Sequence, residues 1–170
     1  MEVQKIMSRG IRTCSPEDAM SRAAQIMWEN DCGVVPVVDA EGRVTSMITD
    51  RDICMATLLA CRPPGELQVS MAASRTIVKV REHDSVEIAE ALMQEHQVRR
   101  LPVVDAQDRL VGVLSMNDLA RSFQMSDGGT VSQREVARTL AAVSQPHHEA
   151  PSSASGARTE RGAQAQRRAS

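Results

Sequence analysis

Apolar residues along the chain repeat one order of spacings twice. In each copy a short extended segment comes first, followed by a stretch in which apolar residues recur every three or four positions. Two stretches rich in Val, Ile and Leu follow, joined by a polar turn, and a second helical spacing closes the copy. These spacings predict strand, helix, strand, strand and helix in each copy. The fold class that we expect is therefore a mixed α/β (α+β) fold.

The two copies align with each other without a gap at an offset of 66 residues, since Pro36 falls on Pro102 (102 − 36 = 66). The sequence PVVDA at 36–40 recurs at 102–106. Two copies are too few for a solenoid, which needs at least about three repeats to bury a continuous core. We therefore expect two pseudo-symmetric repeats that pack against each other as one intramolecular pair.

The repeats also predict the boundaries of the parts of the chain. Repeat 1 covers residues 3–60, and a linker covers 61–68, because its two adjacent prolines cannot continue a helix. Repeat 2 covers 69–123. Residues 130–145 carry one apolar stripe, which predicts a short amphipathic helix. Residues 146–170 contain scarcely an apolar side chain larger than alanine, which predicts a disordered tail.

The first helix of each repeat has a predicted start and a predicted apolar face. Asp18 aligns with Asp84, and Asp84 with Glu87 has the spacing of a capping box, so we expect the two aspartates to cap these helices. The apolar faces exceed what one thin core would cover, which predicts a homodimer packed through helices, with Trp28 as an anchor. The alternative is that these faces are buried within one chain. The faces consist of Ala19, Ala23, Ile26 and Met27 in repeat 1 and Ala89, Leu92 and Met93 in repeat 2.

Polar side chains follow the last strand of each repeat, where the second helix begins. Repeat 1 has Thr49, Asp50, Arg51 and Asp52 there, and repeat 2 has Ser115 and Asp118 in place of Thr49 and Asp52. One interpretation is a capping box, in which hydroxyl and carboxylate satisfy the free N–H groups of the first helical turn. A cap alone explains neither Arg51 nor the position of both motifs directly after a strand, where α/β folds bind nucleotides.

The same residue types suit a nucleoside phosphate. The first turn of a helix offers N–H groups and a positive dipole end to a phosphate beside Thr49 or Ser115, and Arg51 would neutralise its charge. The carboxylates of Asp52 and Asp118 would repel a phosphate, but each can accept hydrogen bonds from the 2′- and 3′-hydroxyls of a ribose. The motif therefore predicts one nucleotide site in each repeat.

With these residues in this order, the chain resembles the cystathionine β-synthase (CBS) domain pair, or Bateman module, over about residues 3 to 123. The resemblance rests on the strands Val35–Asp39 and Leu101–Asp105, on Thr49 or Ser115 at the end of the next strand, and on the aspartate three residues later. The sequence ITDRDI is similar to that of small free-standing bacterial members. The family implies a non-catalytic regulatory module without a cofactor. It would bind AMP, ADP, ATP or S-adenosylmethionine in two clefts and signal through a dimer or an effector protein.

The resemblance also implies where such a ligand would lie. Thr49, Arg51 and Asp52 would hold phosphate and ribose in one cleft, and Ser115 and Asp118 would do so in the other. The residues that would enclose adenine are Thr13, Val35 and Pro36 in repeat 1 and Lys79, Leu101 and Pro102 in repeat 2.

The two motifs differ in charge. Asn117 stands where repeat 1 has Arg51, so we expect unequal occupancy of the two clefts. Arg99 and Arg100 would restore positive charge if they point into the cleft, although a solvated strand edge is the more common role of such a pair.

Composition narrows the choice of partners. The formal net charge is −2, the pI is about 6.1 and aromatic residues make up 1%, so the chain offers neither a basic field nor stacking side chains to nucleic acid. We therefore expect no nucleic acid as a partner. No apolar run approaches the roughly 18 residues of a membrane span and no export signal precedes repeat 1, which predicts a cytoplasmic protein without a membrane contact. The 4 cysteines form no CxxC pair and are expected to be reduced, and His147 with His148 lacks further metal ligands.

Two other functions compete with ligand sensing. An enzyme would use Cys14 or Cys32 with His83 or His96, but no nucleophile, base and orienting group recur at a recognisable spacing. A ligand-free scaffold, in which the motifs serve only as helix caps, is the stronger alternative, because a fold does not dictate function.

Overall fold

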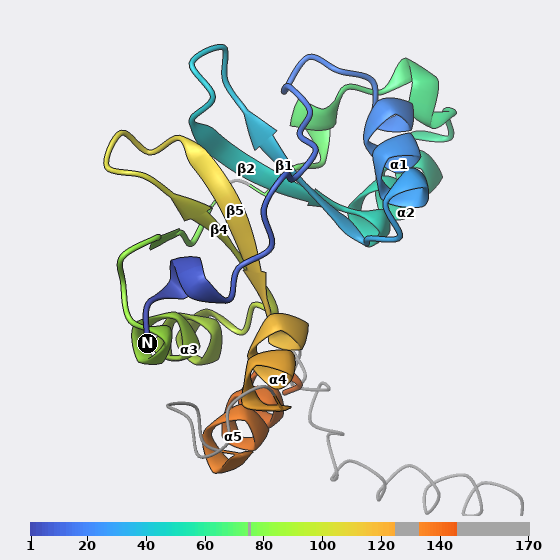
Figure 1. Ribbon diagram of the computed structural model, residues 1–170. Helices are drawn as coiled ribbons and strands as arrows, with labels where there is room; N and C mark the ends of the chain where they lie inside the picture. The colour runs from blue at the N-terminus through green and yellow to red at the C-terminus, as the bar shows by residue number, and fades with distance from the viewer. Residues whose placement is uncertain (75, 125–132, 146–170) are drawn as a thin grey trace, which may run out of the picture.

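The computed structural model describes residues 1–74, 76–124 and 133–145 (Figure 1). The predicted tail at 146–170 lies outside the described residues. Two lobes correspond to the two repeats, and each carries a hairpin and a pair of helices (Figure 1). In chain order the elements, with 3₁₀ helices written η, are η1 Val3–Lys5, α1 Met20–Glu29, β1 Val34–Val38, β2 Val44–Thr49, α2 Asp50–Ala60, η2 Pro64–Glu66, η3 Val69–Met71, β3 Val80–Arg81, α3 Val86–His96, β4 Arg100–Val104, β5 Leu110–Ser115, α4 Met116–Gln124 and α5 Gln133–Val143.

Each repeat is built on an antiparallel hairpin. β1 pairs with β2 and β4 pairs with β5, with Pro36 opposite Met47 and Pro102 opposite Val113. Repeat 2 adds β3 in parallel to β4. The extended segment before α1 forms only an isolated bridge, at Cys14. The predicted order of elements is confirmed, except that the first strand of repeat 1 is reduced to this bridge.

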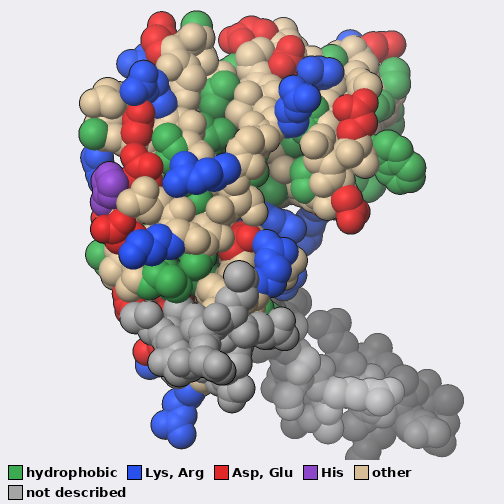
Figure 2. Space-filling model, viewed as in Figure 1, with side chains coloured by type: hydrophobic (Ala, Val, Ile, Leu, Met, Phe, Trp, Pro, Cys, Tyr) green, Lys and Arg blue, Asp and Glu red, His purple; other side chains and the backbone are tan. Residues whose placement is uncertain are grey.

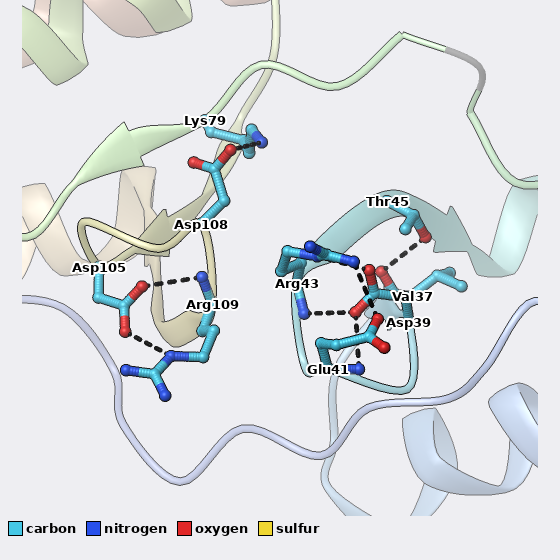
Figure 3. Close-up of polar contacts among 9 residues, drawn as sticks. All are labelled: Val37, Asp39, Glu41, Arg43, Thr45, Lys79, Asp105, Asp108 and Arg109. Carbon is cyan, nitrogen blue, oxygen red and sulfur yellow. Dashed lines mark hydrogen bonds and ion pairs between the residues drawn. The ribbon is translucent and has the colours of Figure 1, made fainter.

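The aspartate of each PVVDA segment stabilises its own hairpin turn. Asp39 accepts hydrogen bonds from the backbone N–H groups of Glu41 and Arg43, and its other oxygen pairs with the Arg43 guanidinium at 2.8 Å. Asp105 and Arg109 repeat this arrangement, with an ion pair at 2.9 Å (Figure 3). The hydrogen bond from the Arg43 side chain lowers the pKa of Asp39. These contacts explain why the aspartate recurs in both copies.

The two hairpins also meet at their turns. The Val44 N–H donates to the Asp108 carbonyl at 3.2 Å, and the Leu110 N–H donates to the Gly42 carbonyl at 3.1 Å. The backbones of the two repeats are therefore bonded directly to each other at this end of the molecule.

Each repeat completes its core with the segment that precedes the other repeat. Residues 1–8 pack on repeat 2, where Val3 joins the core and its N–H donates to the Asp84 carbonyl at 2.9 Å. Residues 67–73 pack on repeat 1, where Val69 is fully buried in the core. Separating the repeats would expose both cores, which explains why they form one intramolecular pair.

The predicted aspartate caps are wrong. The Asp18 carboxylate accepts a hydrogen bond from the Ser15 N–H at 2.8 Å, and Asp84 accepts one from the Arg81 N–H at 2.8 Å. Both aspartates therefore close the turn that precedes the helix. α1 has no side-chain cap, and Ser85 caps α3. Each carboxylate accepts from a backbone N–H three residues earlier in the chain, which lies before the helix and has no helical acceptor. The turn therefore forms in place of the cap.

Most residues of the helix faces that we expected at a dimer contact are buried within the chain, so these faces are not available for it, while the homodimer itself stays a prediction. Ala23 and Ala89 are fully buried, and Ile26, Met27 and Met93 keep 6% or less of their surface exposed. The exchanged segments supply the additional apolar cover. Figure 2 shows hydrophobic side chains exposed instead at the outer edge of the lobe that carries α1 and α2. The large exposed apolar side chains of these two helices are Trp28, Met55, Leu58 and Leu59.

Candidate ligand-binding site

The motif of repeat 1 forms a capping box and leaves one carboxylate oxygen open. The Thr49 hydroxyl accepts from the Asp52 N–H at 3.1 Å and donates to Asp52 Oδ2 at 2.7 Å. The Thr49 N–H donates to the same oxygen at 2.9 Å. No described residue donates a hydrogen bond to Asp52 Oδ1. The cap is therefore real, and the carboxylate keeps an acceptor for another group.

The motif of repeat 2 uses both carboxylate oxygens. Ser115 and Asp118 make the same three contacts, at 2.7, 2.5 and 3.2 Å. The second oxygen, Asp118 Oδ1, accepts from the Ser8 hydroxyl at 3.1 Å and pairs with the Arg121 guanidinium. Asp118 keeps only 4% of its surface exposed. It therefore ties the N-terminal segment to repeat 2.

A cavity of about 490 Å³, here called the repeat 1 cleft, lies between the two repeats. Thr49, Arg51 and Asp52 line it from repeat 1. Repeat 2 contributes polar and apolar side chains from the segment before β3, namely Ser74, Thr76, Ile77 and Val78, and from the segment around the start of β4, namely Val98, Arg99, Arg100 and Pro102. The cleft thus brings together three arginines, the carboxylates of Asp50 and Asp52, and apolar side chains suited to a flat ring.

A smaller cavity of about 280 Å³, the repeat 2 cleft, lies at the second motif. Ser115 and Asn117 line it, together with Arg99, Arg100 and the last turn of α5. The two arginines therefore line both clefts. Both side chains are exposed at the edge of β4, which agrees with a solvated strand edge, and they also line the two clefts.

The CBS domain family is matched by residues 3–58 and by residues 69–124. The chain belongs to the CBS domain family. The two matches fall on the two copies that the offset of 66 residues revealed, and they confirm a CBS domain pair.

Similar proteins include a small CBS protein and three solved CBS structures. The CBS domain-containing protein YhcV of Bacillus subtilis is 39% identical over 125 residues, which cover 74% of this chain and 86% of YhcV. Hypoxic Response Protein I, solved with two coordinated zinc ions, is 34% identical with a TM-score of 0.65, over 71% of this chain and 98% of that one.

Two further structures contain adenosine compounds. The CBS pair of protein MJ0100 was solved in complex with 5′-methylthioadenosine and S-adenosyl-L-methionine; it is 24% identical, with a TM-score of 0.66, over 74% of this chain and 97% of that one. CBSX2 was solved in complex with AMP and is 23% identical, with a TM-score of 0.63, over 73% and 96%. These two likenesses show a shared fold.

Most of the residues expected around adenine lie in the strands of the CBS pair. Pro102 lines the repeat 1 cleft. Val35 and Leu101 are fully buried in the cores of their repeats, and Pro36 is buried beside Val35 in β1. Val35, Pro36 and Leu101 therefore line neither cleft.

The other two expected residues lie away from both clefts. Lys79 forms an ion pair with Asp108 of the repeat 2 turn at 3.1 Å (Figure 3), and Thr13 is half-buried and lines neither cavity. Sequence reasoning missed the end of α5, where Val143 and Gln145 line the repeat 1 cleft. Its apolar stripe indicated that the helix docks, but a stripe does not say on which surface.

The remaining side chains bear on the competing functions. Burial raises the pKa of the Cys14 thiol to about 11, so it is protonated at neutral pH and is not an activated nucleophile. The described residues contain no cluster of three or more His, Cys, Asp or Glu placed to hold a metal ion, and His147 and His148 lie outside them. None of the described helices has the length and apolar character that crossing a membrane requires.

Proposed function

We propose that this CBS pair is a regulatory module that binds an adenosine derivative, such as AMP, ADP, ATP or S-adenosylmethionine, in the repeat 1 cleft. The observation that carries the proposal is one cavity of about 490 Å³ lined by Asp52, Arg51, Arg99 and Arg100. A ribose hydroxyl would donate to Asp52 Oδ1, which no described residue uses. An anionic group of the ligand would lie at the N-terminus of α2, beside Thr49.

The arginines give the ligand a means of joining the repeats. Arg51 belongs to α2 of repeat 1, whereas Arg99 and Arg100 belong to repeat 2. An anion placed among them would relieve the repulsion between like charges and form charge-assisted hydrogen bonds to both repeats. Binding would therefore favour a closed arrangement of the pair, which is a change that a partner could sense.

The repeat 2 cleft supports a structural role. Both oxygens of Asp118 are used within the protein, and Asn117 replaces the arginine of repeat 1. We propose that Ser115 and Asp118 act as a cap and an anchor, and that this cleft takes the ligand weakly or not at all. The scaffold function that competes with ligand sensing thus applies best to this half of the chain.

The signal would be read by a homodimer or by an effector protein. Met55, Leu58 and Leu59 are exposed at helical spacings of three and four, so they share one face of α2. We propose this face as the homodimer contact, in place of the buried faces predicted from the sequence.

Isothermal titration calorimetry of the full chain tests ligand binding. The ligands are AMP, ADP, ATP and S-adenosylmethionine, with GMP as the control for the base. We expect one dominant site per chain. At about 100 times its dissociation constant, a ligand should also raise the free energy of unfolding by about 2.7 kcal/mol, which thermal melting detects. Binding of none of these adenosine compounds at millimolar concentration would overturn the proposal.

A further inference from the structure

In repeat 2, α5 packs against both α3 and α4 (Figure 1). The Gln94 amide donates to the Thr139 hydroxyl at 2.7 Å, Thr139 is fully buried, and Val143 joins the core of repeat 2. The charges of Glu90 in α3 and Glu135 in α5 interact. The helix face of repeat 2 therefore accepts an amphipathic helix, and the chain itself supplies it.

In the part of the chain that the structure describes, no helix fills the equivalent face of repeat 1. A cavity of about 590 Å³, here called the α1–α2 groove, lies between these helices. Its lining includes the apolar side chains of Ala24, Met27, Trp28 and Ile53 and the acidic side chains of Asp31 and Asp50. At the offset of 66 residues, Trp28 corresponds to Gln94 and Ala24 to Glu90, two of the residues that interact with α5 in repeat 2. The groove thus occupies the position that α5 fills in the other repeat.

Trp28 indicates that the groove is a contact surface. Its side chain is 88% exposed, although it lines a cavity whose other apolar members, Met27 and Ile53, are 6% and 7% exposed. A tryptophan held in water beside an apolar cavity gains most from a partner that covers it.

The charges around the groove decide which helix it would accept. The last turn of α5 lies at the cavity that Arg99 and Arg100 line, and arginines suit the negative end of a helix. The aligned positions in repeat 1 are Gly33 and Val34, and Asp50 adds a carboxylate beside them. A side chain at Gly33 would crowd this carboxylate, because an added Cβ would lie 3.1 Å from Asp50 Oδ2. The negative end of α5 would therefore be repelled here.

We propose that the α1–α2 groove binds an amphipathic helix of a partner protein. The apolar side of that helix fills the groove and covers Trp28, and its lysine or arginine side chains meet Asp31 and Asp50. The proposal does not depend on ligand binding in the repeat 1 cleft, because the groove and the cleft lie on different sides of the motif and only Gly33 and Asp50 line both.

A second copy of the chain is a different occupant, and it has a different surface. Met55, Leu58 and Leu59 lie on one face of α2, whereas Asp50 and Ile53, three residues apart, lie on the face that lines the groove. A homodimer through the first face leaves the groove free. The acidic pair, which would meet itself in a symmetric contact, also disfavours a second copy.

Trp28 is the sole tryptophan of the chain, so its fluorescence reports on the groove directly. Two peptide probes carry the sequence of residues 133–145, one with its last two residues changed to lysine and the other with them changed to glutamate. Titrated into the full chain, the lysine peptide should shift the emission to the blue and saturate. The glutamate peptide should bind at least tenfold more weakly, and added salt should reduce the difference because exposed charges are screened.

Matched variants locate the effect. Asp31→Asn with Asp50→Asn should remove the difference between the peptides, and Ala24→Glu should weaken both, whereas Leu59→Ala, outside the groove, should change neither. The proposal is overturned by the absence of a saturable shift or by equal affinity of the two peptides for the unmodified chain. It is also overturned if light scattering finds a dimer that Trp28→Ala converts to a monomer, since the groove would then be a contact between copies.

Discussion

Repeat 1 and repeat 2 carry the same motif after the same strand, yet the structure uses the two motifs differently. Asp52 keeps an open oxygen in a cleft of about 490 Å³, whereas Asp118 gives its second oxygen to Ser8 and Arg121. The difference does not lie in the cap, because its three contacts are the same in both repeats. It comes from Ser8 of the covering N-terminal segment and from Arg121 of α4, where repeat 1 has Met55.

The covering segments come from the two ends of the described chain. Residues 1–8 and α5 both pack on repeat 2, while repeat 1 receives only residues 67–73. Among the described residues, one N-terminal segment and one helix after the repeats therefore cover repeat 2, and neither has a counterpart on repeat 1. The open groove and the open carboxylate of repeat 1 both follow from this inequality.

The largest expected effect is on stability: replacing Asp118 should cost more free energy of unfolding than replacing Asp52. Asp118→Ala removes a buried carboxylate that serves Ser8, Ser115 and Arg121, and should lower the free energy of unfolding by about 3 kcal/mol. Asp52→Ala removes only a cap and should cost about 1 kcal/mol. Urea unfolding of both variants measures the difference. Equal costs would show that the second oxygen of Asp118 contributes nothing.

The next effect is on ligand binding, and here the larger effect should come from a substitution in repeat 1. Arg51→Asn makes the motif of repeat 1 like that of repeat 2, and losing a charge-assisted contact of about 1.5 kcal/mol should weaken ATP binding about tenfold. Adenosine, which lacks the phosphates, should bind as before. Calorimetry checks both ligands, and Arg62→Asn, an exposed arginine paired with Glu66 outside the cleft, is the control. An unchanged preference for ATP over adenosine would place Arg51 outside the phosphate site.

A smaller effect should be a dependence on pH of the docking of α5 on repeat 2. Burial, with the nearby charges of Glu135 and Glu87, raises the pKa of Glu90 to about 7, and Glu90 Oε1 is buried with no hydrogen-bond partner among the described residues. A carboxyl whose pKa is higher in the folded state stabilises that state fully below pH about 4.5, and this contribution is lost as pH rises through about 7. Docking of α5 should therefore weaken between pH 5.5 and 8.5.

Hydrogen exchange of the α5 amides measures this docking. Glu90→Gln is neutral at every pH, so it should protect α5 equally at pH 5.5 and 8.5. Ala24, which aligns with Glu90 in repeat 1, supplies the matched control, because Ala24→Gln should leave the exchange of α5 unchanged. A pH dependence that persists in Glu90→Gln would assign the effect to other groups.

The smallest effect concerns the feature that the repeats share. Arg43→Ala breaks two exposed ion pairs of its hairpin turn, with Asp39 and with Glu41, whereas Arg109→Ala breaks one, with Asp105; each change should cost less than about 1 kcal/mol. The two costs should be close, because both turns share the contacts between aspartate and arginine (Figure 3) and the additional exposed pair of Arg43 with Glu41 contributes little. Thermal melting of the two variants checks this, and clearly unequal shifts would mean that the asymmetry extends into the hairpins.

Local patterns in the sequence determined much of this protein. The offset of 66 residues follows from comparing the sequence with itself. The order of elements, the hairpins and the capping boxes of α2 and α4 depend on residues a few positions apart. Hydrogen bonds within one turn or one hairpin form wherever these residues stand, so the pattern predicts them. The CBS resemblance rests on the same local features and was therefore visible before the fold. The aspartate caps at Asp18 and Asp84 failed because two local contacts, a turn and a helix start, compete for one carboxylate.

The sequence showed the charge difference between Arg51 and Asn117, but tertiary structure decided how each copy is covered. The exchange of segments between repeats, the contact of Ser8 with Asp118, and the place of α5 all join residues that are far apart in the chain. The periodicity of a sequence predicts the apolar face of a helix but not the surface that covers this face. The covering surface depends on which other surfaces remain open after the rest of the chain has packed. For the same reason Arg99 and Arg100 could be seen as a charged pair in the sequence, but their place between two clefts required the packed repeats.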